Sequence, residues 1–238
     1  NERIDDLQRG GLRVIQRADA FRFGTDAVLL ADFAAPRRHD RVCDLGTGTG
    51  IIPLLLYARE NTISADAVEI QPDMADMAAR SMAMNGLNEK IRVLPGDLRS
   101  IRTLLPHARY DLVTCNPPYG KAGGTLLNPD ASKRLARHEE SCAIEDVACA
   151  AAWLLQNGGR LCCVFPAARM IELSDAMRKY RMAPKRIRMV HSRVEKAAHL
   201  CLMEGMLDAR PGLIIEPPLV IYDENNAYTP ELRRIYGL

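Results

Sequence analysis

Apolar residues along this chain form short runs that alternate with longer segments of helical spacing. Between residues 41 and 165, the short runs predict strands at Arg41–Leu45, Ala65–Ile70, Ile91–Leu94, Tyr110–Cys115 and Arg160–Phe165. The segments around them predict helices at Gly50–Arg59, Pro72–Asn85, Leu98–Leu105 and Ile144–Gln156. Strands that alternate with helices are typical of a mostly parallel sheet with helices on both faces. The pattern therefore predicts an α/β fold.

The two ends of the chain depart from this alternation. Residues 5–16, around Gly10-Gly11, predict a hairpin, and Ala27–Phe33 predicts a helix with Thr25 as its N-cap. After residue 165 the pattern predicts a helix at Ala168–Tyr180 and strands at Arg186–His191, Leu200–Leu207, Leu213–Ile215 and Leu219–Tyr222. Because no helix separates these last strands, we expect an antiparallel C-terminal edge. We expect residues 1–238 to form a single domain, in which a hairpin and helix extension (1–40) precedes the core (41–238).

The composition is that of a globular protein, with 47% hydrophobic and 26% charged residues. No apolar run approaches the roughly 20 residues that a membrane span needs, and the N-terminus lacks a signal-peptide core. The seven cysteines include no Cys-x-x-Cys pair, which indicates reduced core thiols. Adjacent Cys162 and Cys163 point to opposite faces of a strand, so they cannot bind one metal ion. We expect a cytoplasmic protein without a membrane span or a metal site; its oligomeric state is left open.

A glycine-rich turn joins the first core strand to the helix that follows it. Gly46, Gly48 and Gly50 let the backbone turn sharply and approach a ligand closely. In the dinucleotide-binding fingerprint the third glycine stands one position later, where this chain has Ile51. Asp44 adds a negative charge that disfavours a pyrophosphate and suits the cationic amino end of S-adenosylmethionine. The turn therefore predicts S-adenosylmethionine as the cofactor, rather than a dinucleotide.

Acidic residues stand at the ends of three consecutive predicted strands. Glu69 follows Asp44 by about twenty residues, where an acidic group bonds the hydroxyls of a ribose. Asp97 ends the third strand, where its carboxylate accepts from an adenine amino group while Leu98 packs against the ring. Each residue also has a simpler interpretation: Asp44 orders the glycine turn, and Glu69 and Asp97 cap helices. The ordered set favours the cofactor site.

A rigid tetrapeptide, Asn116-Pro117-Pro118-Tyr119, follows the fourth core strand. Its two prolines fix φ and remove two backbone donors, so the segment presents acceptors in a stiff frame. The side-chain carbonyl of Asn116 and the backbone carbonyl of Pro117 are placed to accept from the hydrogens of a planar amino group. Tyr119 is placed to stack on an extruded base. A turn that only ends a strand is the alternative. After a cofactor motif, we expect methyl transfer to a planar nitrogen.

These motifs resemble those of the class I S-adenosylmethionine-dependent methyltransferases that modify exocyclic amines. Within that class, the chain resembles the bacterial tRNA adenine-N(6)-methyltransferases that act beside the anticodon of a valine tRNA. The resemblance rests on residues 44–50 and 116–119 and on the flanking segments Phe21–Ala27, Ala136–Glu139, Pro217–Tyr222 and Tyr228–Glu231. It implies a Rossmann-like class I methyltransferase fold, methylation of an adenine amino group in tRNA, and S-adenosylmethionine as cofactor. It also implies that Thr25 and Asp26 lie near the cofactor.

The net charge of +2 conceals two basic clusters. One follows the tetrapeptide and contains Lys133, Arg134 and Arg137. The other includes Arg186 and Arg188, which alternate with apolar residues and so share one face of a strand. A solvated surface explains either cluster alone. Beside a site for a planar base, both clusters predict contacts with RNA phosphates.

Three other functions are compatible with parts of the sequence. The glutamine methyltransferases of translation release factors use the same tetrapeptide, but they usually carry a separate N-terminal helical domain, which the first forty residues do not resemble. DNA adenine methyltransferases commonly need a recognition insert that 238 residues hardly accommodate. A non-catalytic protein that binds S-adenosylmethionine or RNA is the remaining alternative. The intact set of Asp44, Glu69, Asp97, Asn116 and Tyr119 favours an enzyme.

Overall fold

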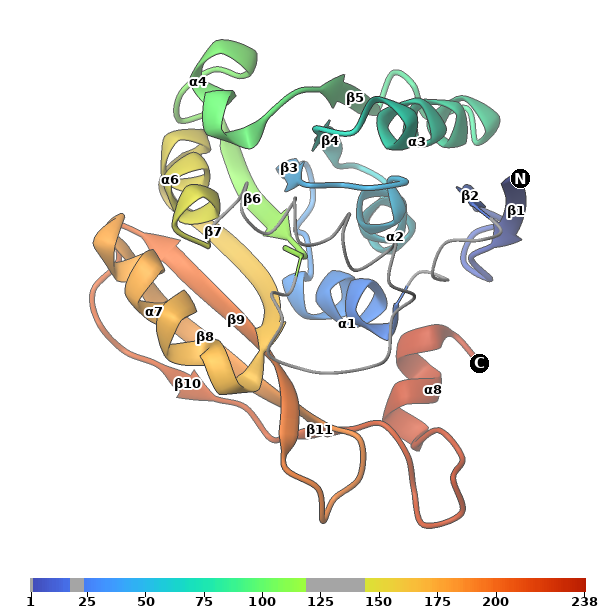
Figure 1. The fold of residues 1–238 in the computed structure, drawn as a ribbon, viewed down its shortest axis with the longest axis vertical. Helices are drawn as coiled ribbons and strands as arrows, with labels where there is room; N and C mark the ends of the chain where they lie inside the picture. Colours follow the sequence, from blue (N-terminus) through green and yellow to red (C-terminus); the bar gives the residue numbers. More distant parts are fainter. Residues whose placement is uncertain (1, 18–23, 119–143) are drawn as a thin grey trace, which may run out of the picture.

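A computed structural model of the chain describes residues 2–17, 24–118 and 144–238. In these residues a sheet with the strand order β10-β8-β9-β7-β6-β3-β4-β5 forms the centre of the molecule, and β11 also pairs with β8 (Figure 1). The strands are β3 (Arg41–Leu45), β4 (Ser64–Glu69), β5 (Ile91–Pro95), β6 (Tyr110–Cys115), β7 (Leu155–Pro166), β8 (Met182–His191), β9 (Ala198–Leu207), β10 (Ile214–Ile215) and β11 (Leu219–Val220).

Strand directions confirm the expected mostly parallel sheet. Strands β5, β4, β3, β6 and β7 all run parallel to their neighbours in this part of the sheet. The antiparallel strand is β9, which lies between β7 and β8 and opposes both. The short strands β10 and β11 return to the parallel direction along β8. The antiparallel pairing expected near the C-terminal edge is therefore made by β9.

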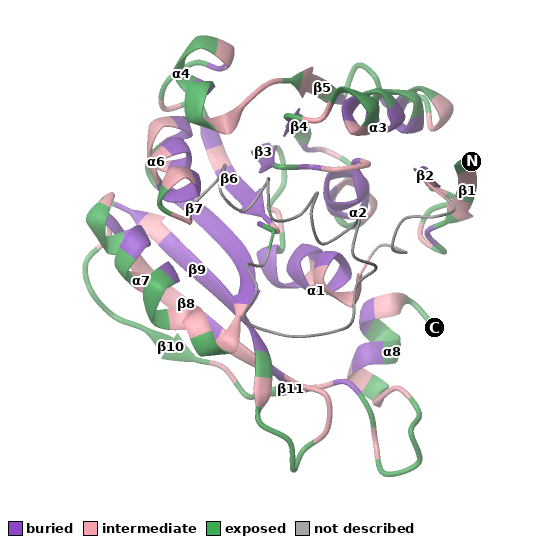
Figure 2. Ribbon diagram, viewed as in Figure 1, coloured by how far each residue is buried: buried purple, intermediate pink, exposed green. Residues whose placement is uncertain are grey.

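Helices cover both faces of the sheet. They are α1 (Thr25–Ala34), α2 (Ile51–Arg59), α3 (Pro72–Met84), α4 (Ile101–Leu104), α6 (Ile144–Leu154), α7 (Met170–Lys179) and α8 (Pro230–Tyr236), with 3-10 turns η1 (Leu98–Ser100) before α4 and η2 (Ala167–Arg169) before α7. On one face α1, α2 and α8 pack against strand residues such as Val42 and Cys162. On the other face α4, α6 and α7 pack against the neighbouring residues of the same strands, such as Cys43 and Cys163. Figure 2 shows the central strands buried between these layers.

The pattern of burial bears out the expectation that Cys162 and Cys163 point to opposite faces, because each belongs to a different hydrophobic cluster. Within the described ranges, no group of three His, Cys, Asp or Glu residues is placed to hold a metal ion. No helix in those ranges is long and apolar enough to cross a membrane.

The N-terminal hairpin, β1 (Glu2–Asp6) and β2 (Arg13–Arg17), docks on α3. The backbone N–H of Ile15 donates to the Ser81 hydroxyl at 2.9 Å, and Arg80 pairs with Glu2 at 2.6 Å. Val14 of the hairpin belongs to the same hydrophobic cluster as α1 and α2. The hairpin therefore shares a hydrophobic cluster with these helices.

Several local features differ from the sequence-based predictions; β8, for example, begins at Met182 rather than Arg186. Helix α1 begins at Thr25 with Gly24 as its N-cap, so the prediction of Thr25 as N-cap was wrong. Strand β7 begins at Leu155 rather than Arg160, because Gly158, with φ of 77°, lets the chain re-enter the sheet after an irregular pairing with β6. The seven-residue helix α8, capped by the Thr229 side chain, was not predicted.

A buried group of charges joins the C-terminal end of α1 to the sheet. Glu204 on β9 accepts from Arg160 on β7 and from Arg186 on β8, both at 3.2 Å. Arg160 also donates to the Ala34 carbonyl at 3.0 Å, and Arg186 donates to the Phe33 carbonyl at 2.8 Å. The two guanidinium groups thus satisfy carbonyls at the end of the helix, where a positive charge is favoured by the helix dipole.

Loss of Glu204 is expected to be costly, since it removes the buried carboxylate that the two guanidinium groups share. Arg160 would keep a longer contact to Asp40 at 3.4 Å, and Arg186 its pair with Glu216. We expect Glu204→Gln to lower the free energy of unfolding by about 3 kcal/mol in urea denaturation at neutral pH. The matched control is Glu172→Gln, which breaks the exposed Arg169–Glu172 pair and is expected to cost less than about 1 kcal/mol. Equal losses in the two variants would contradict the role of Glu204.

Candidate cofactor and substrate site

A cavity of about 370 Å³ lies at the carboxyl ends of β3, β4, β5 and β6. This edge is where open α/β sheets bind their ligands, and the volume is within the range of cofactor sites. The cavity is lined by Leu45, Gly46, Gly48, Val68, Glu69, Ile70, Gln71, Met74, Gly96, Asp97, Leu98, Cys115, Asn116, Pro117, Pro118 and Val147. Five of the cofactor residues predicted from the glycine turn and the strand ends are therefore brought together around one space with Asn116 and Pro117 of the tetrapeptide.

The glycine turn forms one wall of the cavity. Gly46 and Gly48 have φ of 71° and 57°, which side-chain-bearing residues rarely adopt, and a Cβ at either position would meet open space. Gly50, also predicted as a cofactor residue, has a different role. Its Cβ would approach the Met82 side chain to 2.5 Å, so the glycine lets α2 pack closely against α3. Gly46 and Gly48 therefore leave room for a ligand, whereas Gly50 is required by the packing of α2 against α3.

Glu69 holds the glycine turn in shape from the end of β4. Its side chain is buried, and Oε2 accepts from the Gly48 N–H at 2.8 Å. Its Oε1 accepts from the Gln71 N–H at 2.9 Å, just before α3. Each carboxylate oxygen has two lone pairs, so both oxygens keep capacity to accept from the hydroxyls of a ribose. Glu69 therefore orders the turn and also faces the cavity.

Asp97 occupies the corresponding place after β5. Its Oδ1 accepts from the Arg99 N–H at 2.9 Å, so it caps η1, as the simpler interpretation of the sequence holds. The Arg99 guanidinium also contacts both carboxylate oxygens, and these hydrogen bonds hold the pKa of Asp97 below its usual value. Asp97 is thus an ionised acceptor on the cavity wall, next to Leu98.

Asp44 lies behind the glycine turn and is fully buried. The Thr114 hydroxyl on β6 donates to its Oδ1 at 2.6 Å, whereas Oδ2 makes no hydrogen bond within the described part of the chain. Burial and, to a smaller extent, the charge of Glu69 raise the pKa of this carboxyl to about 7, although the hydroxyls of Thr114 and Thr47 oppose the shift. A buried carboxylate oxygen of this kind fits a cationic group of a ligand. Asp44 is the residue expected to face the amino end of the cofactor.

The tetrapeptide forms the wall opposite Glu69 as far as the structure describes it. Asn116 is half-buried, Pro117 is buried and Pro118 is exposed, and all three line the cavity. They follow β6, which pairs with β3 in the middle of the sheet, so the segment begins beside the glycine turn. Tyr119 lies outside the described residues. The arrangement brings a stiff segment with acceptor oxygens against the predicted cofactor site.

Four predicted cofactor residues do not line the cavity. Asp44 and Gly50 lie behind its wall, and Thr25 and Asp26 lie apart from it. Thr25 and Asp26 begin α1, and the Thr25 hydroxyl contacts the Tyr236 hydroxyl of α8 at 3.2 Å. Sequence reasoning in turn missed several lining residues, of which Ile70 is the most informative. Ile70 directly follows Glu69 and is 43% exposed, and an apolar residue after the acidic end of a buried strand was a signal for a ring-binding surface.

The predicted RNA contacts Arg186 and Arg188 share one face of β8, but both are engaged inside the protein. Arg186 bonds Glu204 and Glu216, and Arg188 bonds Glu231 of α8 at 2.8 Å. These carboxylates match their charges within the protein, and contact of either arginine with RNA phosphates stays a prediction. The other predicted contacts, Lys133, Arg134 and Arg137, lie outside the described residues.

Comparison with known proteins agrees with this geometry. Residues 18–186 match the family model described as methyltransferase small domain. A relative from Porphyromonas gingivalis, named tRNA1(Val) (adenine(37)-N6)-methyltransferase, is 32% identical over 92% of this chain and 89% of its own length. A relative of the same name from Tolumonas auensis is 34% identical over 89% of this chain and 86% of its own length.

Solved structures share the fold. A predicted O-methyltransferase from Agrobacterium tumefaciens aligns with a TM-score of 0.74 and 24% identity, over 90% of this chain and 96% of its own. The geranyl diphosphate C-methyltransferase of Streptomyces coelicolor, solved with S-adenosyl-L-homocysteine, aligns with a TM-score of 0.55 and 14% identity, over 76% of this chain and 78% of its own. At these identities the likeness concerns the fold alone.

The raised pKa of Asp44 predicts how pH affects stability. The unfolded carboxyl ionises near pH 3.8, and the folded carboxyl near pH 7. Between these values the folded state keeps a proton that the unfolded state has lost, so the contribution of Asp44 to stability falls as pH rises toward 7. Asp44→Asn lacks this titration. We expect the stability of Asp44→Asn relative to the parent to rise by about 2 kcal/mol from pH 5 to pH 8. Urea denaturation at both pH values measures it, and a constant difference would contradict the assignment.

Proposed function

This chain belongs to the methyltransferase small domain family, and we propose that it methylates the exocyclic amino group of an adenine in tRNA. The specific substrate we propose is the adenine beside the anticodon of a valine tRNA, with S-adenosylmethionine as the methyl donor. The proposal assigns the reaction to the cytoplasm, where tRNA is the macromolecular partner. It rests on the site and on the names of relatives that cover most of this chain.

The observation that carries the proposal is a single cavity with two kinds of wall. One wall has the glycines of the turn together with Glu69 and Asp97, and the other has Asn116 and Pro117. The first set suits a charged nucleoside, whereas the second suits a planar amino group. Methyl transfer to a planar nitrogen needs these two ligands side by side, with the donor carbon facing the acceptor nitrogen.

S-Adenosylmethionine fits the residues that are present. The open space at Gly46 and Gly48 admits the ligand backbone, Glu69 accepts from the ribose, and Asp97 with Leu98 and Ile70 accommodates the adenine. The unpartnered oxygen of buried Asp44 suits the cationic amino end. When bound, the cofactor supplies an electrophilic methyl group on a sulfonium.

The protein's own contribution is positioning. The Asn116 side-chain carbonyl and the Pro117 backbone carbonyl accept from the two hydrogens of the target amino group, which turns the nitrogen lone pair toward the cavity. Because the prolines fix the backbone, the acceptors need little reorganisation when the base enters. The methylated nitrogen is acidic and loses its proton late, so a strong base at the nitrogen is not required. Tyr119 completes this arrangement as the predicted stacking residue.

The direct test is mass spectrometry of nucleosides from total tRNA incubated with the protein and isotopically labelled S-adenosylmethionine. We expect labelled N6-methyladenosine, enriched in valine tRNA. A translation release factor incubated in parallel tests for methylated glutamine, the main alternative. Label in the protein but not in the tRNA would overturn the proposal, and cofactor binding without any transfer would indicate a non-catalytic protein.

Substitutions on the two walls separate cofactor binding from chemistry. Asn116→Ala is expected to lower kcat about a hundredfold while the Kd for S-adenosylmethionine stays within about threefold, because its contact matters most at the reacting nitrogen. Glu69→Gln keeps the shape of the side chain but removes its charge. We expect it to weaken cofactor binding roughly ten- to hundredfold, as befits a lost hydrogen bond to a charged group of about 1.5–3 kcal/mol.

Calorimetry gives the Kd, and single-turnover methylation at saturating cofactor gives the rate. If Asn116→Ala weakens cofactor binding as much as Glu69→Gln does, the division of roles between the two walls is wrong. If Glu69→Gln binds the cofactor like the parent, the ribose contact lies elsewhere.

A further inference from the structure

The C-terminal segment reaches the same edge of the sheet as the proposed methyl-transfer site. Strand β7 is parallel to β6, so its last residues lie at the edge where Asn116 follows β6. Strand β9 starts at this edge, since Leu200 pairs with Pro166 at the end of β7. Strand β11 pairs with Val190 and His191 at the end of β8, also at this edge. Residues just after β11 therefore project beyond the ends of the strands.

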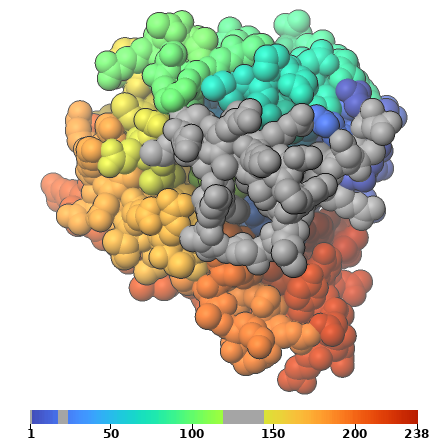
Figure 3. Space-filling view, viewed as in Figure 1, coloured from blue at the N-terminus to red at the C-terminus, as the bar shows by residue number. Residues whose placement is uncertain are grey.

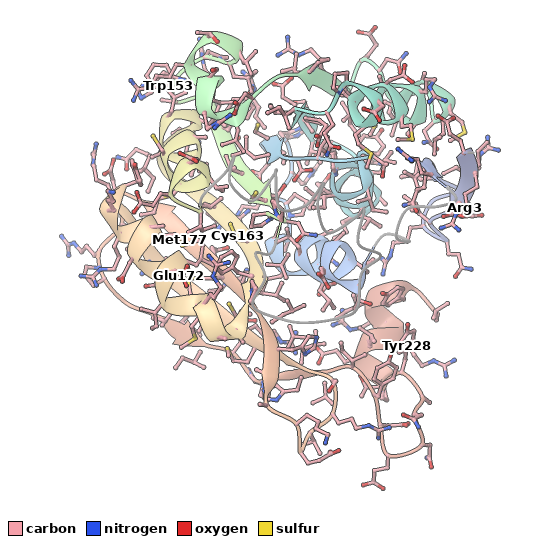
Figure 4. The ribbon with its side chains drawn as sticks, viewed as in Figure 1. Arg3, Trp153, Cys163, Glu172, Met177 and Tyr228 are labelled. Atoms are coloured by element: carbon pink, nitrogen blue, oxygen red, sulfur yellow. The ribbon has the colours of Figure 1, made fainter. Side chains whose placement is uncertain are left out.

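Three tyrosines form a stack there. The rings of Tyr222 and Tyr228 have centroids 5.5 Å apart at an interplanar angle of 26°, and Tyr228 lies 5.5 Å from Tyr236 at 14°. Tyr228 is the middle ring and lies beside α8 (Figure 4). Tyr236 is the inner ring, and its hydroxyl contacts Thr25 at 3.2 Å. The stack thus runs outward from the start of α1.

The outermost ring, Tyr222, is held rigidly although it is 37% exposed. Its N–H donates to the Ser192 carbonyl at 2.9 Å, and the chain turns back so that Tyr222 pairs with Tyr228 in an isolated bridge. The Arg193 guanidinium donates to the Asp223 carbonyl at 3.1 Å and fixes the turn between the two tyrosines. The inner two rings already anchor α8, whereas Tyr222 presents an aromatic ring at the surface in a fixed orientation.

We propose that Tyr222 is a stacking platform for a second, unmethylated nucleotide of the RNA substrate, so that a base continues the stack of three tyrosines. This inference rests on the proposed function and adds a contact outside the cavity. Bases stack on rigid aromatic side chains whatever their sequence, and such contacts position a single strand on a protein. In Figure 3 the β8–β9 connection and the C-terminal segment project together at one end of the molecule, where a strand that extends past the site would meet them.

The strand order gives the distance between the two contacts. From β6, which precedes Asn116, to β11, which precedes Tyr222, the sheet crosses β7, β9 and β8. Four steps of about 4.8 Å amount to about 19 Å. A stacked single strand covers that distance in about six nucleotides at 3.4 Å each, and an extended strand in fewer. The second nucleotide is therefore close enough to the target adenine for both to belong to the same RNA loop.

The turns beside Tyr222 carry charges of both signs. Glu195, Lys196 and Glu224 are exposed there, and the Arg193 guanidinium is already bonded to the turn. These charges do not form a basic patch for a phosphate, whereas the exposed ring of Tyr222 offers a stacking surface for a base. Stacking on Tyr222 is thus expected to be insensitive to salt, unlike contacts between cations and phosphates.

The first experiment compares tRNA methylation by Tyr222→Ala, Tyr222→Phe and a control, Tyr180→Ala. Tyr180 lies at the end of α7, at the opposite edge of the sheet from the site. We expect Tyr222→Ala to raise the KM for tRNA about tenfold or more, with kcat at saturating tRNA and the Kd for S-adenosylmethionine unchanged. Tyr222→Phe and Tyr180→Ala should resemble the parent. The salt dependence of tRNA binding should have the same slope in all of them.

A second experiment separates stacking from a structural role of Tyr222. Anticodon stem-loops carrying one abasic nucleotide, at each loop position in turn, are bound to the parent and to Tyr222→Ala. At one position within about six nucleotides of the target adenine, we expect removal of the base to weaken RNA binding by the parent protein. The loss should equal that caused by Tyr222→Ala with the intact RNA. In Tyr222→Ala, removal of the same base should cause no further loss of affinity. A merely misfolded variant would instead lose affinity equally for every RNA.

The outcomes distinguish this inference from the function on which it rests. If the parent does not methylate tRNA, the proposed function fails and the platform with it. If the parent methylates tRNA but Tyr222→Ala has the parent's KM, or no abasic position shows the shared loss, only the platform is overturned. A change in the salt dependence of tRNA binding in Tyr222→Ala would also overturn the platform, because that result indicates that Tyr222 supports a phosphate contact.

Discussion

The carboxylate of Glu204 between two guanidinium groups is the interaction on which the layout of the site depends. Arg160 and Arg186 come from strands on either side of β9, and each also bonds a carbonyl at the end of α1. These bonds hold the antiparallel strand β9 between β7 and β8, and they hold the C-terminal end of α1 on the sheet. Because α1 and β9 then have defined positions, the start of α1 and the segment around α8 meet beyond the strand ends. Burying these charges is expensive without all partners, so the arrangement tolerates little variation.

Glu69 imposes a similar constraint on the cofactor side. One carboxylate connects the glycine turn to the start of α3, through the N–H groups of Gly48 and Gln71. The same oxygens retain acceptor capacity toward the cavity. The residue that binds the cofactor in our proposal is thus also the residue that shapes the turn before the cofactor arrives. Such preorganisation reduces the ordering cost of binding, and it explains why one acidic side chain at a strand end serves both purposes.

Local patterns in the sequence predicted what depends on local chemistry. The alternation of strands and helices from Arg41 to Phe165, the glycine turn and the acidic strand ends all follow from neighbouring residues. The structure has this alternation and places Gly46, Gly48, Glu69 and Asp97 around one cavity. The ion pairs of Arg186 are the opposite case: its partners Glu204 and Glu216 lie 18 and 30 residues further on, and no spacing rule reveals them. Helix α8 has seven residues and is held by stacked tyrosines from another turn, so its own periodicity was too short to identify it.

The shared fold shows where substrate choice has to be made. Structures with TM-scores of 0.74 and 0.55 to this chain are named for O-methylation and for C-methylation of geranyl diphosphate, so the shared fold does not decide the acceptor. Selectivity must come from parts that border the cavity or extend its edge. In our proposal the tetrapeptide after β6 is one such part. The turn between Tyr222 and Tyr228 is another, because β9 and β11 carry the polypeptide back to the same edge. An enzyme that takes one adenine from a folded RNA needs both a pocket for that base and a distant contact that sets its register, and this edge of the sheet provides a place for each.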